Sequence, residues 1–392
     1  MRFVDLQAQQ GRIREEILRR IHQVLGHGQY IMGPEVQELE AKLSAYVGVK
    51  HAVACSSGTD ALLMALMALG VGRGDAVFTT PFTFMATAEV IALVGATPVF
   101  VDIDPRTFNL SADQLALAVK AVGDGDPGVY PLPRDHGDGQ RLNLRGVIPV
   151  NLFGLTADYE RIRDIARANG LFVVEDAAQS LGAEYFGKMS GSLGDMACTS
   201  FYPSKPLGCY GDGGMCFTDD DELAAGLRSL RDHGSDGNRR SEGVRIGING
   251  RLDTIQAAVL LAKLEIFPGE LELRQQVASR YTALMSCPGP GLAPLPPHVP
   301  SGHRSAWALY SVLARDEGHR SLLQGRLGRK RIPFGVYYPK PLHLLPAFAY
   351  LGYREGDLPV SEDVSRRILS LPMHPYLREE EQERIASALS VG

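Results

Sequence analysis

The sequence predicts an α/β fold: a large domain with a mostly parallel seven-stranded sheet, followed by a smaller C-terminal α+β domain. Short β-branched or apolar runs alternate with helical periodicities of roughly ten to fifteen residues, which is typical of βαβ units. Several of these runs are apolar without interruption, among them residues 99–101 and 172–174. Such runs are expected of strands that are covered on both faces of a sheet.

The strand candidates for this sheet are residues 51–55, 76–79, 98–102, 146–151, 171–175, 196–200 and 214–218. Between them, helical spacing predicts one helix through Val36, Leu39, Leu43 and Val47, and further helices over residues 60–69 and 159–168. Residues 122–141 fit neither pattern, because they are rich in Gly, Asp and Pro. We expect an exposed loop or flap there.

The regions that flank the sheet are more helical. An amphipathic helix is predicted before it, through Ile13, Ile17, Leu18, Ile21 and Leu25. Residues 251–286 are strongly helical, and Pro268 should break or kink that helix. A short strand over residues 307–314 and a helix after Tyr376 belong to the smaller domain. We therefore divide the chain into residues 1–250, the N-terminal helix and large domain, and residues 251–392, the linking helix and small domain.

Composition narrows the class of protein. The 392 residues carry a formal net charge of -5, which argues against nucleic acid or an anionic membrane surface as the main partner. The N-terminus lacks a signal-peptide layout, and no apolar run is long enough to span a bilayer. Five cysteines, an odd number, predict reduced thiols in a cytoplasmic protein. Cys209 and Cys216 lack metal-ligand spacing with any histidine, so we expect no metal.

The first candidate for chemistry is Lys205, in the stretch Thr199-Ser-Phe-Tyr-Pro-Ser-Lys205. It lies just beyond a predicted strand end, where open α/β sheets bind ligands, and a glycine-rich run follows it. A lysine becomes a good nucleophile only when burial or a cationic neighbour lowers its pKa. The alternative is an ordinary solvated surface lysine.

The second candidate is Asp176, which follows the apolar strand of Phe172-Val-Val-Glu-Asp176. Alternation along the strand should send Glu175 and Asp176 to opposite sides. Asp176 can hold a proton on a heterocyclic nitrogen, as a pyridinium electron sink requires. It can also be a plain helix N-cap, because Asp favours that position.

The third candidate is the small-residue turn Cys55-Ser-Ser-Gly58-Thr59-Asp60, where a strand runs into a helix. Free N–H groups at such a helix start form an anion site, although many βα turns look alike. Neither a Gly-x-Gly-x-x-Gly run nor a Walker lysine accompanies this turn, so dinucleotide and P-loop sites are not predicted.

Taken together, the three elements and their order resemble the DegT/DnrJ/EryC1/StrS family of sugar aminotransferases, which are fold-type I pyridoxal-phosphate enzymes. The resemblance runs from about residue 3 to the C-terminus, and residues 122–141 are its main departure. The matching stretches are Gly28-Gln-Tyr-Ile-Met-Gly33, Ser57-Gly-Thr-Asp-Ala-Leu, Pro81-Phe-Thr-Phe-Met-Ala-Thr87, Gly95-Ala-Thr-Pro-Val-Phe-Val-Asp102, Val150-Asn-Leu-Phe-Gly154, Glu175-Asp-Ala-Ala-Gln-Ser180, Ser200-Phe-Tyr-Pro-Ser-Lys205 and Asn249-Gly-Arg-Leu-Asp253.

The resemblance implies roles for individual residues. Lys205 would form the Schiff base with pyridoxal 5'-phosphate and carry the proton, and Asp176 would pair with the pyridine nitrogen. The other cofactor contacts would be Gly58, Thr59 and Ser200 at the phosphate, Phe84 on the ring face, Gln179 near the phenolic oxygen, and Asn249 reaching in from the second subunit of a homodimer with shared active sites. The substrate contacts would be Arg251, which suits a carboxylate, and Tyr338 and His343 on the sugar side.

The resemblance also implies a reaction. Glutamate would supply the amino group, and the acceptor would be C3 of a UDP-linked 3-keto-N-acetylglucosamine uronic acid, for surface polysaccharides. The alternative acceptor is C4 of a nucleotide 4-keto-6-deoxy sugar. A sugar 3-dehydratase of the same fold has histidine at the lysine position, and a non-catalytic sensor has no need of the three elements together. Lys205 and its companions argue against both.

Overall fold

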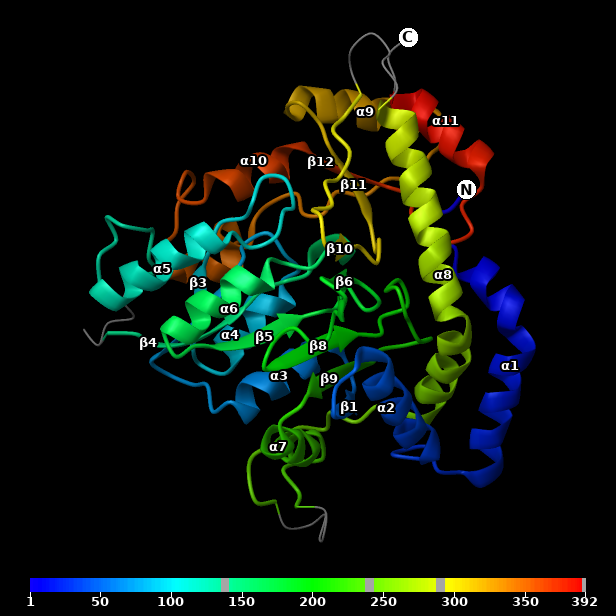
Figure 1. Ribbon diagram of the computed structural model, residues 1–392, viewed down its shortest axis with the longest axis horizontal. Coiled ribbons are helices and arrows are strands. Elements are labelled where there is room, and N and C mark those ends of the chain that lie inside the picture. Colours follow the sequence, from blue (N-terminus) through cyan, green and yellow to red (C-terminus); the bar gives the residue numbers. More distant parts are fainter. Residues whose placement is uncertain (135–140, 237–242, 287–292, 390–392) are drawn as a thin grey trace.

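The computed structural model describes residues 1–134, 141–236, 243–286 and 293–389. A seven-stranded sheet lies at its centre (Figure 1). In spatial order, its strands are β1 (His51–Cys55), β9 (Gly214–Thr218), β8 (Met196–Ser200), β5 (Phe172–Asp176), β4 (Asn143–Ile148), β2 (Asp75–Thr79) and β3 (Thr97–Phe100). β9 pairs antiparallel with β1 and β8, and the remaining neighbours pair in parallel. The predicted mostly parallel, seven-stranded sheet is therefore confirmed.

Helices cover both faces of this sheet, and alternate strand residues point to opposite faces. One face packs against α3 (Gly58–Ala68), α4 (Ala86–Leu93) and α7 (Asp221–Arg231). The other face packs against α2 (Pro34–Val47) and α8 (Thr254–Ser286) at one end, and α5 (Ala112–Asp124) and α6 (Tyr159–Ala168) at the other. Val173 faces the second layer and Val174 the first, as the uninterrupted apolar strand requires.

Of the break or kink predicted at Pro268, the break is wrong, because α8 runs as one helix of 33 residues through this proline. A proline inside a helix costs about 3 kcal/mol or more. Packing along the whole length of α8 offsets this cost: Leu261 and Phe267 lie in the core beside the sheet, and Tyr281 lies in the core of the C-terminal region. Figure 1 shows α8 joining these two parts of the molecule.

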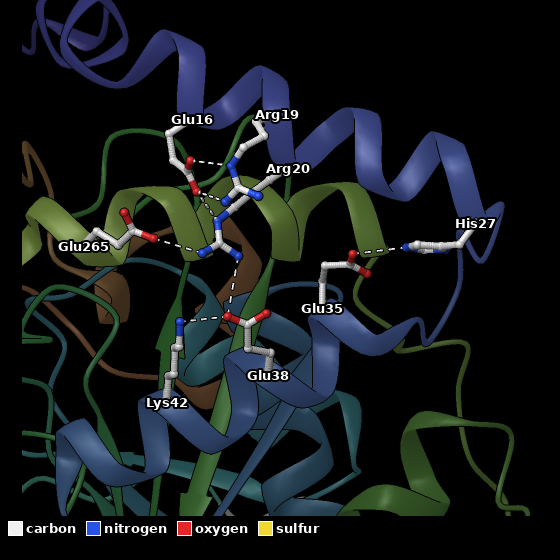
Figure 2. A network of polar contacts seen from close by, with 8 residues as sticks. All are labelled: Glu16, Arg19, Arg20, His27, Glu35, Glu38, Lys42 and Glu265. Carbon is white, nitrogen blue, oxygen red and sulfur yellow. Dashed lines mark hydrogen bonds and ion pairs between the residues drawn. The ribbon is translucent and has the colours of Figure 1, made fainter.

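The N-terminal helix α1 (Leu6–His27) lies against α8, with Ile17 buried on Val259 and Ala262. Polar contacts join α1 to its neighbours on the outside of this packing (Figure 2). Arg20 forms ion pairs with Glu38 of α2 and Glu265 of α8. The predicted N-terminal amphipathic helix is therefore present, and it is held both by apolar packing on α8 and by ion pairs to α2 and α8.

The C-terminal region has a core of its own around Trp307, Tyr281 and Tyr310. Its elements are β11 (Tyr310–Leu313), β12 (Ile368–Leu371), α9 (Glu317–Arg329), α10 (Pro359–Arg367) and α11 (Glu379–Leu389). The short helices η2 (Leu342–Leu344) and η3 (Pro346–Leu351) instead contribute Leu342, Phe348 and Leu351 to the core of the large sheet. We propose to keep the division near residue 250, with this segment as an excursion onto the large domain.

Three smaller strands and one further turn complete the described elements: β6 (Glu184–Tyr185), β7 (Lys188–Met189), β10 (His303–Arg304) and η1 (Leu152–Gly154). No helix in the described ranges is both long and apolar enough to cross a membrane.

The prediction of an exposed loop over residues 122–141 is confirmed for residues 125–128, which form an exposed turn, and is wrong at its start and at a few buried positions. α5 continues to Asp124, and Val122 is buried. Tyr130 is buried too, and its hydroxyl accepts a hydrogen bond of 2.8 Å from the backbone N–H of Asp102. The composition of the segment did not predict these buried residues, because only a few apolar side chains are needed to fix a short segment. Residues 135–140 lie outside the described residues.

Candidate active site

Asp176 lies at the carboxyl end of β5 and is buried. Its carboxylate accepts hydrogen bonds from Thr87 Oγ1 at 2.8 Å and from the backbone N–H of Ala178 at 3.1 Å. Burial raises the pKa of Asp176, whereas these donors and the positive charge of Lys205 oppose the rise. The chain after Asp176 forms turns and no α-helix, so the helix-cap interpretation is wrong. The carboxylate is thus held ready for a cationic partner.

Glu175 points to the opposite side of β5, as predicted. It is fully buried, and its carboxylate accepts hydrogen bonds from Asn151, Ser190 and two backbone N–H groups, those of Gly191 and Leu193. Asn151 also donates its backbone N–H to the carbonyl of Asp176. Glu175 therefore fixes the strand end that presents Asp176.

Lys205 lies in a tight turn after β8, where its N–H donates to the carbonyl of Tyr202 at 2.9 Å. Burial lowers the pKa of Lys205, and the negative charge of Asp176 opposes this change. Part of the residue stays accessible. The chain then folds back so closely that a Cβ at Gly208 would lie 2.6 Å from the carbonyl oxygen of Pro203. The interpretation as an ordinary solvated lysine does not fit these surroundings.

The Ser57–Thr59 turn and the end of β8 form one cradle. Ser57 caps α3 by accepting a hydrogen bond from the N–H of Asp60 at 3.0 Å, which leaves the N–H groups of Gly58 and Thr59 at the helix start. A Cβ at Gly58 would lie 2.7 Å from Cβ of Ser200, so only glycine permits this approach. The helix start and the Ser200 hydroxyl thus come together as donors for an anion.

Gln179, Tyr338 and Phe84 extend the site outward. Gln179 accepts a hydrogen bond from the N–H of Phe153 at 2.8 Å, and its amide nitrogen donates to the Tyr338 hydroxyl at 3.4 Å. Burial raises the pKa of Tyr338 well above its usual value, so its hydroxyl stays protonated. Phe84 is 59% exposed and precedes Thr87 by one turn, so its ring is free to cover a ligand at Asp176.

Asn249 and Arg251 lie far from these residues in sequence, although Gly250 between them accepts a hydrogen bond of 2.9 Å from the N–H of Ser56, next to the cradle. Asn249 is exposed and pairs with Asp232 in an isolated bridge. Arg251 forms an ion pair with the Asp232 carboxylate. Their assignment to the active site stays a prediction.

His343 does not line the site, and the prediction that it contacts the substrate is wrong for this conformation. Its side chain has no exposed surface, and Nε2 is paired with Glu362 at 3.1 Å. Its ring lies near Phe100 and Tyr353 in the core. A histidine in a Pro-rich turn gave no sign of this burial.

Two further contributors were not singled out from the sequence. Thr87 donates to Asp176, and Asn151 donates to Glu175. Both stand in stretches that carry the family resemblance, but their roles require knowledge of which strand ends are neighbours. β5 and β4 are adjacent, and this adjacency brings Asn151 beside the end of β5.

The residues fit a phosphate-bearing heterocyclic cofactor. Gly58, Thr59 and Ser200 offer hydrogen-bond donors to a phosphate, Asp176 offers a carboxylate to a ring nitrogen, and Lys205 offers an amino group whose pKa burial lowers. These are the groups that hold and activate pyridoxal phosphate in proteins.

Comparison with known proteins identifies the family. Residues 11–390 match the model of the DegT/DnrJ/EryC1/StrS aminotransferase family. The chain is 46% identical to the UDP-2-acetamido-2-deoxy-3-oxo-D-glucuronate aminotransferase of Pseudomonas aeruginosa, over 99% of both chains. A DegT/DnrJ/EryC1/StrS aminotransferase of Brucella abortus superposes with a TM-score of 0.91 at 49% identity, over 99% of this chain and 98% of that one.

A second similar structure concerns the cofactor. The PLP-form of a sugar aminotransferase of Streptococcus pneumoniae superposes with a TM-score of 0.83 at 28% identity, over 96% of this chain and 95% of that one. The match of fold and sequence extends over nearly the whole chain. The protein belongs to the DegT/DnrJ/EryC1/StrS aminotransferase family.

Proposed function

We propose that the protein is a pyridoxal-phosphate-dependent aminotransferase that moves an amino group from glutamate to a nucleotide-linked keto-sugar. The acceptor is C3 of UDP-2-acetamido-2-deoxy-3-keto-glucuronic acid. The observation that carries the proposal is the joining of Lys205, Asp176 and the Gly58–Ser200 cradle in one site. The relative from Pseudomonas aeruginosa supports the choice of acceptor.

Different residues of the site would carry out different parts of the reaction. Pyridoxal phosphate, when bound, supplies an electron sink for the pair left behind as a proton leaves carbon. Asp176 keeps the ring nitrogen protonated, because the buried carboxylate gains from a cationic partner. Lys205 takes the proton from the donor's carbon and returns it to the acceptor side, and its lowered pKa leaves the amine free to accept a proton. Phe84 and Gln179 orient the ring.

We assign Arg251 to a carboxylate of the donor or of the sugar acid. Its guanidinium Nε is buried and has no hydrogen-bond partner in the described part of the chain. A planar fork with a spare donor suits a carboxylate better than a phosphate alone. Tyr338, whose hydroxyl reaches Gln179, is the remaining candidate for the sugar side.

The site is proposed to be completed by a second subunit in a homodimer. Three large apolar side chains of the large domain are exposed: Phe84, Tyr202 at 54% and Ile246 at 86%. Large exposed apolar side chains of this kind favour association. Asn249, which is also exposed, is assigned to the partner's phosphate, and burying that charge unpaired would be costly.

Hybrid dimers test this arrangement. Inactive Lys205→Ala subunits mixed with inactive Arg251→Ala subunits should form dimers with one doubly damaged and one intact site. Activity should recover to about a quarter of wild type, on random pairing in a two-fold dimer. Absence of recovery, despite subunit exchange shown by mass tags, would place Arg251 in the site of its own chain.

The acceptor is tested with a panel of keto-sugar nucleotides. Purified protein with glutamate should aminate the UDP-linked 3-keto uronic acid faster than nucleotide 4-keto-6-deoxy sugars, with 2-oxoglutarate formed in equal amount. Faster amination at C4 would establish the alternative function. A product that has lost water in place of gaining an amine would instead indicate a dehydratase.

We place this reaction in surface polysaccharide assembly, in the lipopolysaccharide or O-antigen class, and in the cytoplasm. The activity of the Pseudomonas aeruginosa relative on a UDP-linked sugar acid supports the pathway. The cysteines at positions 55, 198, 209 and 216 are buried free thiols, which supports a reducing compartment.

A further inference from the structure

Two buried threonine hydroxyls stand in line behind the Asp176 carboxylate. Thr87, in the first turn of α4, donates its hydroxyl to Asp176 Oδ2 at 2.8 Å. Thr83 lies in the segment that leads into α4, and its hydroxyl oxygen is 3.2 Å from that of Thr87. The two threonines are only 2% (Thr83) and 1% (Thr87) exposed. The proposed function gives neither of them a task.

The direction of both hydrogen bonds follows from the number of protons available. A hydroxyl has one proton to donate and two lone pairs with which to accept. Because an ionised Asp176 carboxylate has no proton, the proton between it and Thr87 belongs to Thr87. The Thr87 oxygen then offers only lone pairs to Thr83, so Thr83 donates the outer hydrogen bond. In the chain Thr83–Thr87–Asp176, here called the relay, both O–H groups are directed toward the carboxylate.

The Thr87 hydroxyl does not make the bond that a threonine usually makes in a helix. There, the hydroxyl ordinarily bonds to the backbone carbonyl about three or four residues earlier. Thr87 instead bonds to the end of a strand that lies 89 residues away in sequence. Its backbone N–H donates to the carbonyl of Phe84 at 3.3 Å, so the turn is closed without the hydroxyl. The hydroxyl therefore serves the carboxylate and not the helix.

The relay makes the Asp176 carboxylate a weaker base. Burial raises the pKa of Asp176, and the hydrogen bond from Thr87 is foremost among the contacts that lower it. A donor to the charged form of a carboxylate stabilises that form. Thr83 adds to this effect, because a hydroxyl that accepts a hydrogen bond becomes a stronger donor. The backbone N–H of Ala178 acts on the other carboxylate oxygen in the same sense.

The basicity of this carboxylate decides where a shared proton lies. A carboxylate and a pyridine nitrogen that face each other share one proton, either on nitrogen as a pyridinium or on oxygen as a carboxylic acid. The net charge of the pair is the same in both forms, but only the pyridinium is an efficient electron sink. Burial favours the neutral pair, because two separated charges are costly to desolvate. Donors to the carboxylate are needed to oppose that preference.

We propose that Thr83 and Thr87 are positioning residues that keep the shared proton on the ring nitrogen of the cofactor by donating in series to Asp176. Phe84 belongs to the same segment, so residues 83–87 would both cover the ring face and set the charge of the ring nitrogen. The outer hydrogen bond is longer than the inner one, so Thr83 has the smaller effect. The proposal rests on the pairing of Asp176 with the ring nitrogen, which belongs to the proposed function, and not on the choice of donor or sugar.

The test is the ¹⁵N resonance of the ring nitrogen in holoenzyme reconstituted with ring-¹⁵N pyridoxal phosphate, without donor or sugar. In wild type it should lie at the pyridinium position. Thr87→Val has a methyl group in place of the hydroxyl and should shift the resonance toward neutral pyridine. Thr83→Val should shift it in the same direction by less, and Thr87→Ser should restore the wild-type position. A wild-type resonance in Thr87→Val would overturn the proposal.

Asp176→Asn separates this proposal from the proposed function. Without a carboxylate beside it, the ring nitrogen should lose its proton, and the resonance should move to the neutral position. An unchanged resonance in Asp176→Asn would refute the pairing of Asp176 with the ring nitrogen, and the relay with it. A shift in Asp176→Asn without one in Thr87→Val would refute only the relay.

Thr79→Val is the matched control. Thr79 is also fully buried, at the end of β2, and its hydroxyl donates to the backbone carbonyl of Ile148 at 2.9 Å. Its replacement removes a buried hydrogen bond that does not involve a carboxylate. Thr79→Val should therefore lower stability but keep the wild-type resonance. A shift as large as that of Thr87→Val would show that any disturbance of packing moves the resonance, and would contradict the proposal.

The rate of the half-reaction with glutamate gives a second readout. A hydrogen bond to a charged group changes an equilibrium by about tenfold or more, so Thr87→Val should lower kcat by about tenfold, and Thr83→Val by less. KM for glutamate should stay unchanged, because neither hydroxyl faces the donor. A raised KM at wild-type kcat would contradict the relay.

Thr83→Val and Thr83→Ser carry the test if Thr87→Val does not fold, since Thr83 does not touch the carboxylate. The valine variant should shift the ¹⁵N resonance toward neutral pyridine, and the serine variant should not. Identical resonances in the two variants would overturn the relay.

Discussion

Two polar networks of the chain use carboxylates in opposite surroundings. At the end of β5, Glu175 and Asp176 are buried, and the donors they accept from include backbone N–H groups. Between α1, α2 and α8, Arg20, itself only 8% exposed, faces Glu38 and Glu265, whose side chains are 40% and 52% exposed (Figure 2). The carboxylates of the first network are buried, whereas those of the second are partly solvated.

This difference decides what each network can do. A buried carboxylate that loses one hydrogen-bond partner cannot replace it with water. Its position is therefore fixed, and its charge acts strongly on neighbouring groups. An exposed ion pair is screened and easily replaced by water. The chain places its chemistry in the first kind of network and its helix packing in the second.

The largest effect is expected at Lys205, which Asp176 faces. Lys205→Ala should abolish amino transfer and leave the fold intact, because the lysine lies in a turn and contributes little to packing. Loss of activity with an unchanged circular dichroism spectrum is the expected result. Borohydride reduction of the wild type, followed by peptide mapping, should place the cofactor on Lys205. Its discovery on Lys188 or Lys340 would contradict the assignment.

Asp176→Asn should keep the cofactor bound but lower the rate by several orders of magnitude. An amide can hydrogen-bond to the ring nitrogen, but it cannot stabilise a positive charge there, and the electron sink depends on that charge. Single-turnover rates and cofactor absorbance separate binding from chemistry. Near-normal turnover would mean that Asp176 only orders the turn through Ala178.

Glu175→Gln should destabilise the fold by about 2–3 kcal/mol, because its amide N–H₂ would face a backbone N–H that the carboxylate now satisfies. Urea unfolding of the holoenzyme measures the change. Glu265→Gln makes the same chemical substitution in the exposed network and should cost about 0–1 kcal/mol. Equal losses would show that burial does not separate the two networks.

His374, a buried residue, should make the stability of the fold depend on pH. Its pKa falls from 6.5 to about 4 in the folded chain because burial disfavours the charged ring. Between these values the unfolded chain binds more protons, so stability should rise with pH from about 4 to 6.5 and then level off. The contribution is about 3 kcal/mol at most. His374→Asn should flatten this part of the stability curve, and an unchanged slope would assign it to other groups.

The sheet could be predicted from the sequence because its strands are apolar on both faces. Lys205 and Asp176 could be predicted as site residues because each follows such a strand. Strand ends were less predictable. β4 starts at Asn143, three residues before the predicted start at 146, because the strand pairs with Asp75 of β2 through its backbone, whatever its side chains. Hydrogen bonds to a neighbour extend a strand beyond its apolar run.

What could not be predicted depends on contacts between distant segments. The burial of His343 against Glu362, and the unbroken course of α8 through Pro268, follow from packing that no local pattern carries.

The smallest effect is expected at Arg20, and it tests the comparison from the exposed side. Arg20→Met keeps most of the aliphatic stem, which packs against the helix, and removes only the guanidinium. Glu16, Glu38 and Glu265 can then turn to water, so the loss of stability should be about 1 kcal/mol or less. Because the Debye length shrinks to about 3 Å at 1 M salt, the difference between Arg20→Met and wild type should vanish in about 1 M NaCl. The loss caused by Glu175→Gln should persist there, since its partners are sealed from salt. Suppose instead that Arg20→Met lowers the free energy of unfolding as much as Glu175→Gln does, and that salt does not remove the difference. The packing of α1 would then depend on ion pairs that behave as buried ones, even though the carboxylates around Arg20 are partly solvated.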